Sequence, residues 1–138
     1  MAKAKVLKST VTIRDSYELN NSTVDVLLDI KIGAEGQSSL TEVKLTDPKT
    51  GESRIIVTDI SGSFNEPVAC GTNEDLPKKV LKISTLVQDI SPDTDDTFED
   101  IRITGGKDEF HQRMEKTVSS QGETVFYTAT IRFFKVQS

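Results

Sequence analysis

The side chains best suited to chemistry lie in one acidic stretch, "DISPDTDDTFED", residues 89–100. It holds six carboxylates and no base, and Ca²⁺ is bound by several carboxylate oxygens. The spacing does not follow the EF-hand loop, because Phe98 stands where a loop starting at Asp93 requires glycine. A solvated acidic loop explains the stretch as well. We therefore predict no bound metal, and the calcium candidates, should one bind, are Asp93, Asp95 and Asp96.

Catalysis by a nucleophile or a general base would depend on very few residues. His111 is the only histidine and Cys70 is the only cysteine. His111 lies in a polar segment beside Glu109 and Arg113, which predicts a surface position. Cys70 has no basic neighbour in sequence closer than Lys78, so nothing there would lower its pKa. With no phosphate-binding glycine motif in the chain, we predict a protein that is not an enzyme and uses no cofactor.

Composition narrows the class of protein further. The chain has 138 residues, a formal net charge of −5 and a pI near 4.9, which argues against binding nucleic acid through its phosphates. The start "MAKAKVLKSTVTI" lacks the apolar core of a secretory signal, and no apolar run is long enough to cross a membrane. We expect a single domain, residues 1–138, with a short basic N-terminal arm, residues 1–5. It would be made in the cytoplasm without a signal peptide and would not insert into membranes.

Alternating apolar and polar residues predict most of the chain to be β-strand. The clearest hairpin surrounds the turn sequence Asp47-Pro48-Lys49-Thr50-Gly51. The strands expected from these patterns cover residues 6–14, 23–32, 40–46, 54–59, 79–90, 98–106 and 124–136, with short extended pieces between 60 and 77.

Two segments are less certain. Residues 79–90 fit a strand or a helical stripe, and we favour the strand because β-branched residues recur between Pro77 and Pro92. Residues 107–120 form the only plausible helix, since Phe110 and Met114 would stack one turn apart on its buried side. The sequence thus predicts an all-β fold: one antiparallel β-sandwich, immunoglobulin-like or a compact barrel, of seven to eight strands with at most one short helix.

The last strand suggests a function. Its alternate residues from Val125 to Phe133 are apolar and should face the core, whereas Phe126 and Phe134 should face outward. Either another part of the chain or a neighbouring subunit would cover these two rings. Because both termini lie in or next to expected strands, we also expect edges that pair across subunits. The predicted interface residues are Lys3, Lys5, Lys8, Phe126, Arg132 and Phe134.

These patterns favour a non-enzymatic structural protein that self-associates or joins neighbouring subunits of a larger particle. Virus particles, phage tails and contractile injection systems are assemblies of this kind. The alternative is a calcium- or carbohydrate-binding β-sandwich module that uses the acidic 89–100 loop. The partners expected are protein subunits, most simply further copies of this chain.

Overall fold

Two packed β-sheets make up the protein. The computed structural model describes residues 8–33, 37–89, 96–117 and 124–136, and within these ranges it has nine strands and no helix. The sheets do not close into a barrel, so the arrangement is a β-sandwich. The strands are β1 (Lys8–Glu18), β2 (Asp25–Gly33), β3 (Gln37–Thr46), β4 (Ser53–Ser61), β5 (Val68–Thr72), β6 (Val80–Asp89), β7 (Asp96–Thr104), β8 (Phe110–Thr117) and β9 (Thr124–Phe134).

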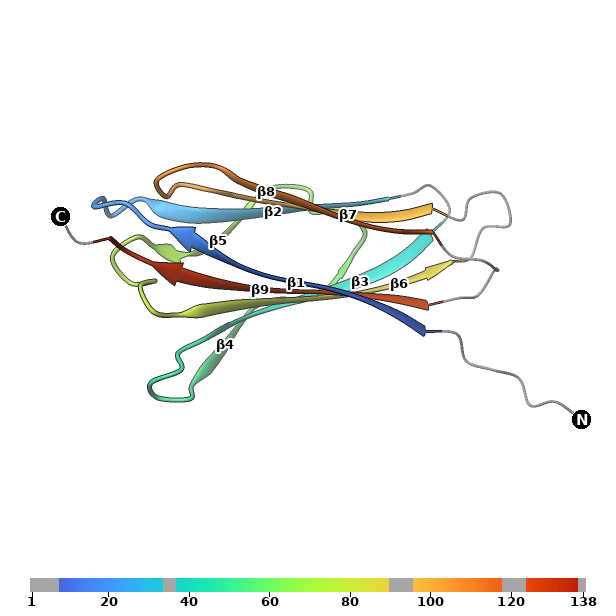
Figure 1. The fold of residues 1–138 in the computed structure, drawn as a ribbon, viewed down its shortest axis with the longest axis horizontal. Coiled ribbons are helices and arrows are strands. Elements are labelled where there is room, and N and C mark those ends of the chain that lie inside the picture. The colour runs from blue at the N-terminus through green and yellow to red at the C-terminus, as the bar shows by residue number, and fades with distance from the viewer. Residues whose placement is uncertain (1–7, 34–36, 90–95, 118–123, 137–138) are drawn as a thin grey trace, which may run out of the picture.

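One sheet has five strands in the order β1-β9-β6-β3-β4, and the other has four in the order β5-β2-β7-β8. Figure 1 shows the two layers edge-on, with the four-stranded sheet above and β1 and β8 nearest the viewer. All neighbouring strands are antiparallel except β1 and β9, which are parallel. The fold therefore joins the first and last strands side by side.

Strand β9 confirms the expected alternation. Its inner row, Val125, Tyr127, Ala129, Ile131 and Phe133, is at most 1% exposed. However, β9 lies between β1 and β6, so its backbone is paired on both sides. The expectation that terminal strands form sheet edges is therefore confirmed for β1 and wrong for β9.

The core lies between the two inner faces and extends further along β1 than the sequence predicted. We expected β1 to end at Arg14, but it continues to Glu18 and buries Tyr17, whose ring meets Phe110 and Phe133 edge-to-face. In the opposite sheet we expected a strand from residue 23, but β2 begins at Asp25, and Val24 is 57% exposed.

The predicted helix is wrong, and so is the strand count. Residues 110–117 form strand β8, in which Phe110 and Met114 are buried on one side. Two residues four apart share a face in a strand as well as in a helix. Gln112 lies between them on the same side but at the sheet edge, where its polar side chain donates to Asp15 (3.4 Å). This polar residue interrupts the apolar–polar alternation that would have predicted a strand.

The two other local predictions are confirmed. Residues 80–89 form strand β6 and not a helix. The 47–51 turn joins β3 and β4, with Gly51 donating its N–H to the Asp47 carbonyl (2.7 Å) at a φ of 78°. The β3–β4 pairing contains register irregularities near Val43, which bend β4 at the sheet edge.

Candidate functional site

The outer face of the five-stranded sheet carries a row of apolar side chains. Leu40 on β3 pairs with Leu86 on β6, and Leu86 pairs with Phe126 on β9, so the three residues lie side by side across three strands. Leu40 is 47% exposed, Leu86 is 36% exposed and Phe126 is half-buried. We call Leu40, Leu86 and Phe126 the apolar row.

Four residues further along β9, the same face carries cations. Thr130 on β9 lies between Arg14 on β1 and Lys82 on β6, and Arg132 follows two residues later on β9. These three cationic side chains line a hollow of about 460 Å³ on the sheet surface. Within the described residues none of the three has an ion pair.

One acid borders this basic hollow. Asp15 contributes to its lining, but its carboxylate accepts a hydrogen bond from the backbone N–H of Ser16 (2.8 Å) and one from Gln112 (3.4 Å). The carboxylate is therefore directed to the sheet edge, and the hollow retains an excess of positive charge.

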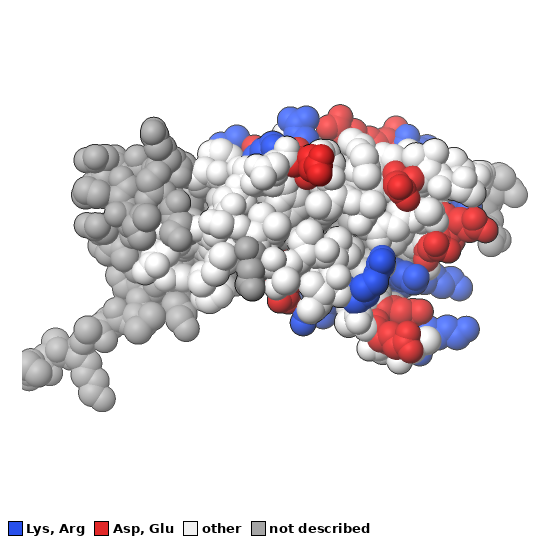
Figure 2. Space-filling view, turned by 180° about the vertical axis from the view of Figure 1, so that it is seen from behind, with Lys and Arg blue, Asp and Glu red and all other residues white. Residues whose placement is uncertain are grey.

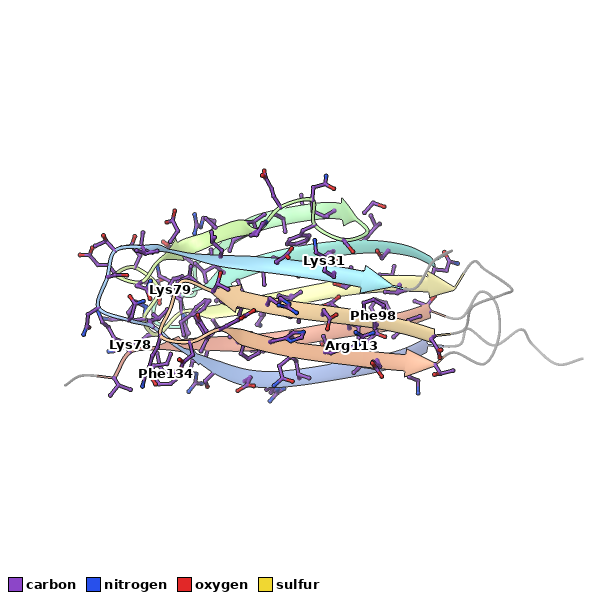
Figure 3. All side chains as sticks on the ribbon, turned by 90° about the horizontal axis from the view of Figure 1, so that it is seen from above. Lys31, Lys78, Lys79, Phe98, Arg113 and Phe134 are labelled. Carbon is purple, nitrogen blue, oxygen red and sulfur yellow. The ribbon has the colours of Figure 1, made fainter. Side chains whose placement is uncertain are left out.

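The predicted interface residues fall in several places. Arg132 is exposed on the face just described, whereas Phe126 and Phe134 are half-buried. Phe134 lies at the same end of the molecule as Lys78 and Lys79 (Figure 3), eight residues along β9 from Phe126, so the two rings do not form one patch. Lys8 begins β1, and Lys3 and Lys5 lie outside the described residues.

The outer face of the four-stranded sheet is different, because its charged side chains pair with one another. Asp100 accepts from His111 (3.2 Å) and from Arg113 (3.3 Å), and Arg113 also meets Glu115 (2.7 Å). The Arg113 guanidinium lies 4.0 Å above the centre of the Phe98 ring on the neighbouring strand (Figure 3). His111 is thus on the surface, as predicted, although on a strand.

The side of the sandwich formed by β4 and β5 has little charge. Figure 2 views this side and shows mostly uncharged surface through the middle, with charged side chains toward one end and along the four-stranded sheet at the top. A hollow of about 410 Å³ there is lined partly by Ile60, Phe64 and Val68.

The acidic stretch is not one loop. Asp89 ends β6, and the last five residues, 96–100, belong to β7. Because side chains alternate along β7, Asp96 and Asp100 point outward. Asp96 accepts a hydrogen bond from the Thr117 hydroxyl (2.7 Å), while Asp93 and Asp95 lie outside the described residues. No group of three or more potential metal-binding side chains occurs in the described ranges.

Two buried groups have strongly raised pKa values. Burial raises the pKa of the Cys70 thiol to about 12, so the thiol stays protonated and is a poor nucleophile. Burial also raises the pKa of Glu99, which is completely buried, from its usual 4.5 to about 7. The Thr85 hydroxyl nearby offsets part of this rise, but neither Glu99 oxygen has a partner at hydrogen-bonding geometry. The buried position of Glu99 was not predicted from the sequence.

Comparison with known proteins identifies no relative. No family model, no curated protein and no solved structure matches the chain. In the part of the chain that the structure describes, no helix is long and apolar enough to cross a membrane.

Proposed function

We propose that the protein is a non-enzymatic assembly subunit that self-associates through the outer face of its five-stranded sheet. Virus particles, phage tails and contractile injection systems are the class of assembly that we have in mind. The observation that carries the proposal is the apolar row, in which two leucines on neighbouring strands are exposed in direct register.

The apolar row supports an interface because isolated exposed leucines are normal on a protein surface but contiguous ones mark contact sites. Leu40 and Leu86 are directly opposite each other, and in antiparallel sheets such pairs have Cβ atoms about 5 Å apart. A second copy that covers them would remove both side chains from water at once.

The basic hollow supports the same face and restricts its partner. Arg14, Lys82 and Arg132 repel one another, and no carboxylate of the described chain forms an ion pair with them. The chain as a whole has a net charge of −5, so the rest of a second copy's surface is acidic on balance. Charge complementarity therefore favours contact between this hollow and an acidic part of another copy.

Replacing both leucines by threonine tests the proposal. Threonine suits an exposed strand position, so Leu40→Thr with Leu86→Thr should change the free energy of unfolding of the subunit only slightly. Apolar anchors buried at an interface cost about 2 kcal/mol or more when truncated, which is about a 30-fold weaker association. We expect sedimentation velocity over a range of concentrations to show a shift from large to small species.

Val24→Thr is the matched control, because Val24 is an exposed apolar residue outside the apolar row. It should leave the mass distribution unchanged. A wild-type protein that stays monomeric at every concentration would overturn the proposal. So would a double variant that assembles as the wild type does.

A further inference from the structure

The described part of the sandwich has four edge strands, and three of them carry features that discourage pairing. Strand β4 is bent by register irregularities, and β5 has only five residues and a register shift in its pairing with β2. Strand β8 exposes His111 and a series of charged side chains, namely Arg113, Glu115 and Lys116. Natural proteins protect sheet edges from further strands by these means.

Strand β1 lacks these protections over residues 9–13, although the charged Arg14, Asp15 and Glu18 follow. It has eleven residues and pairs with β9 without any register shift. Its middle presents Thr10 and Thr12 on the outer face, and the apolar Val11 and Ile13 on the inner face are only partly buried. An added strand would therefore find a regular edge with apolar side chains still to be covered.

The hydrogen-bond pattern shows which backbone groups of β1 point away from β9. Leu19 donates its N–H to the Phe134 carbonyl (2.8 Å), just beyond the strand. In a parallel ladder every second residue bonds to the neighbouring strand, so odd-numbered residues of β1 bond to β9 and even-numbered residues point outward.

Two of the outward positions are already occupied. The Ser16 N–H donates to the Asp15 carboxylate (2.8 Å), and the Glu18 carbonyl accepts from the Lys107 N–H (3.0 Å). As far as the described residues show, the open part of the edge is therefore centred on Thr12, with Thr10 and Arg14 two residues away on either side.

We propose that β1 pairs antiparallel with β1 of a second copy, about a twofold axis through Thr12. This register pairs Thr12 with its counterpart and Thr10 with Arg14 of the other copy, so every open N–H and C=O in the centre finds a partner. On the inner face Val11 would lie opposite Ile13 of the other copy, and apolar side chains would cover each other.

Shifting the axis by one residue is less favourable in either direction. An axis through Val11 would bring two cationic residues, Lys8 and Arg14, opposite each other, and directly opposed like charges destabilise a sheet. An axis through Ile13 would place Val11 opposite Asp15 and would need the Ser16 N–H, which is already engaged. Thr12 is therefore the centre that both the backbone and the side chains favour.

The inference rests on the proposed function and adds a second contact between copies, at the edge of the five-stranded sheet. Joined at β1, the two five-stranded sheets would form one continuous sheet, and both apolar rows would lie on the same side of it. The pair would then offer one broad face to the next subunits of the assembly.

A cysteine at the axis tests the pairing. In a hydrogen-bonded antiparallel pair the Cα atoms are about 5.5 Å apart, which is within the range of a disulfide. Thr12→Cys should therefore give a covalent dimer under mild oxidation, seen on a non-reducing gel. Ser16→Cys is the matched control: it is exposed on the same strand and face, but the proposed register separates the two copies of this residue by more than about 20 Å. Cys70 is buried and does not compete.

Thr12→Pro provides a second measurement. The Thr12 N–H points away from β9, so proline removes hydrogen bonds between the copies and keeps the β1–β9 ladder. We expect the dimer to dissociate at least tenfold more readily in sedimentation equilibrium, with an unchanged far-ultraviolet circular dichroism spectrum. If Thr12→Pro unfolds, the comparison of Thr12→Cys with Ser16→Cys tests the pairing by itself.

The outcomes separate the two proposals. Strong cross-linking of Thr12→Cys with little from Ser16→Cys supports the pairing. An assembling wild-type protein whose Thr12→Cys variant fails to cross-link, or cross-links no better than Ser16→Cys, overturns the pairing and leaves the proposed function standing. A wild-type protein that is monomeric at every concentration overturns both.

Discussion

The outer faces of the two sheets differ in how their charged and apolar side chains are paired or covered. On the four-stranded sheet, Asp100, His111, Arg113 and Glu115 pair with one another, and Arg113 also covers the Phe98 ring. On the five-stranded sheet, three cations share one hollow with no carboxylate of the described residues paired to them, and two leucines beside Phe126 remain exposed. One face needs no partner, whereas the other leaves charge and apolar surface unsatisfied.

This difference is the reason why we propose the outer face of the five-stranded sheet as the interface. Each exposed ion pair contributes little to the free energy of unfolding, usually less than about 1 kcal/mol. Such pairs nevertheless satisfy the face locally, so that a second subunit would have to break them in order to bind. On the outer face of the five-stranded sheet the Glu42–Lys44 pair (3.4 Å) lies outside the apolar row and the basic hollow, so covering the leucines need not break an ion pair and is favourable.

The largest expected effect concerns the inner side of the four-stranded sheet, where Glu99 is a completely buried acid with no hydrogen-bond partner among the described residues. Below about pH 4.5 both folded and unfolded chains hold its proton. Between pH 4.5 and 7 only the folded chain holds it, so stability falls as pH rises, and above pH 7 the loss is constant. A rise in the pKa of Glu99 from 4.5 to about 7 corresponds to a loss of roughly 3 kcal/mol in the free energy of unfolding.

The free energy of unfolding of Glu99→Gln, relative to that of the wild type, should therefore rise by about 3 kcal/mol between pH 4 and pH 8. Urea unfolding of both proteins at the two pH values measures this difference. Comparing the two pH values cancels any constant cost of burying the amide. Glu74→Gln, at an exposed position, controls for removing one carboxylate. A difference that does not vary with pH would mean that Glu99 is solvated or paired in the folded protein.

A smaller effect is expected from Gly33→Ala, which disturbs the paired face. Gly33 lies opposite Phe98, and a methyl group there would overlap the ring on which Arg113 stacks. The ring must move, at a cost of about 1–2 kcal/mol in the free energy of unfolding. The same substitution in a Phe98→Ala background should cost clearly less.

Assembly should not change in Gly33→Ala, since the four-stranded face is not the proposed interface. Loss of the large species with the fold retained would mean that the outer face of the four-stranded sheet, and not that of the five-stranded sheet, forms the interface.

Much of the fold was predictable because burial on one face imposes a period of two on each strand. Val125 to Phe133 and Ile101 with Ile103 gave this signal clearly. It failed at β8, where Gln112 occupies an inward position at an edge and is therefore tolerated as a polar residue. Sequence patterns indicate which residues are buried, so an edge strand with a polar inward residue, such as β8, does not show the alternation that predicts a strand.

The candidate site was less predictable, because it depends on which strands are neighbours. Leu40, Leu86 and Phe126 are far apart in the chain and become one row only through the order β3, β6, β9. Arg132 was predicted, but Arg14 and Lys82 join it only because β1 and β6 flank β9. Glu99 did leave a signal, since it falls in the inward series with Thr97, Ile101 and Ile103.

Hydroxyl-radical footprinting at low and high protein concentration tests the central claim most directly, because it reports the exposure of individual side chains on both faces. We predict that Leu40 and Leu86 become protected as the protein assembles, while His111 and Phe98 keep the reactivity that they have in the dilute protein. Protection of His111 and Phe98 with Leu40 and Leu86 unchanged would contradict the claim that the five-stranded sheet forms the interface.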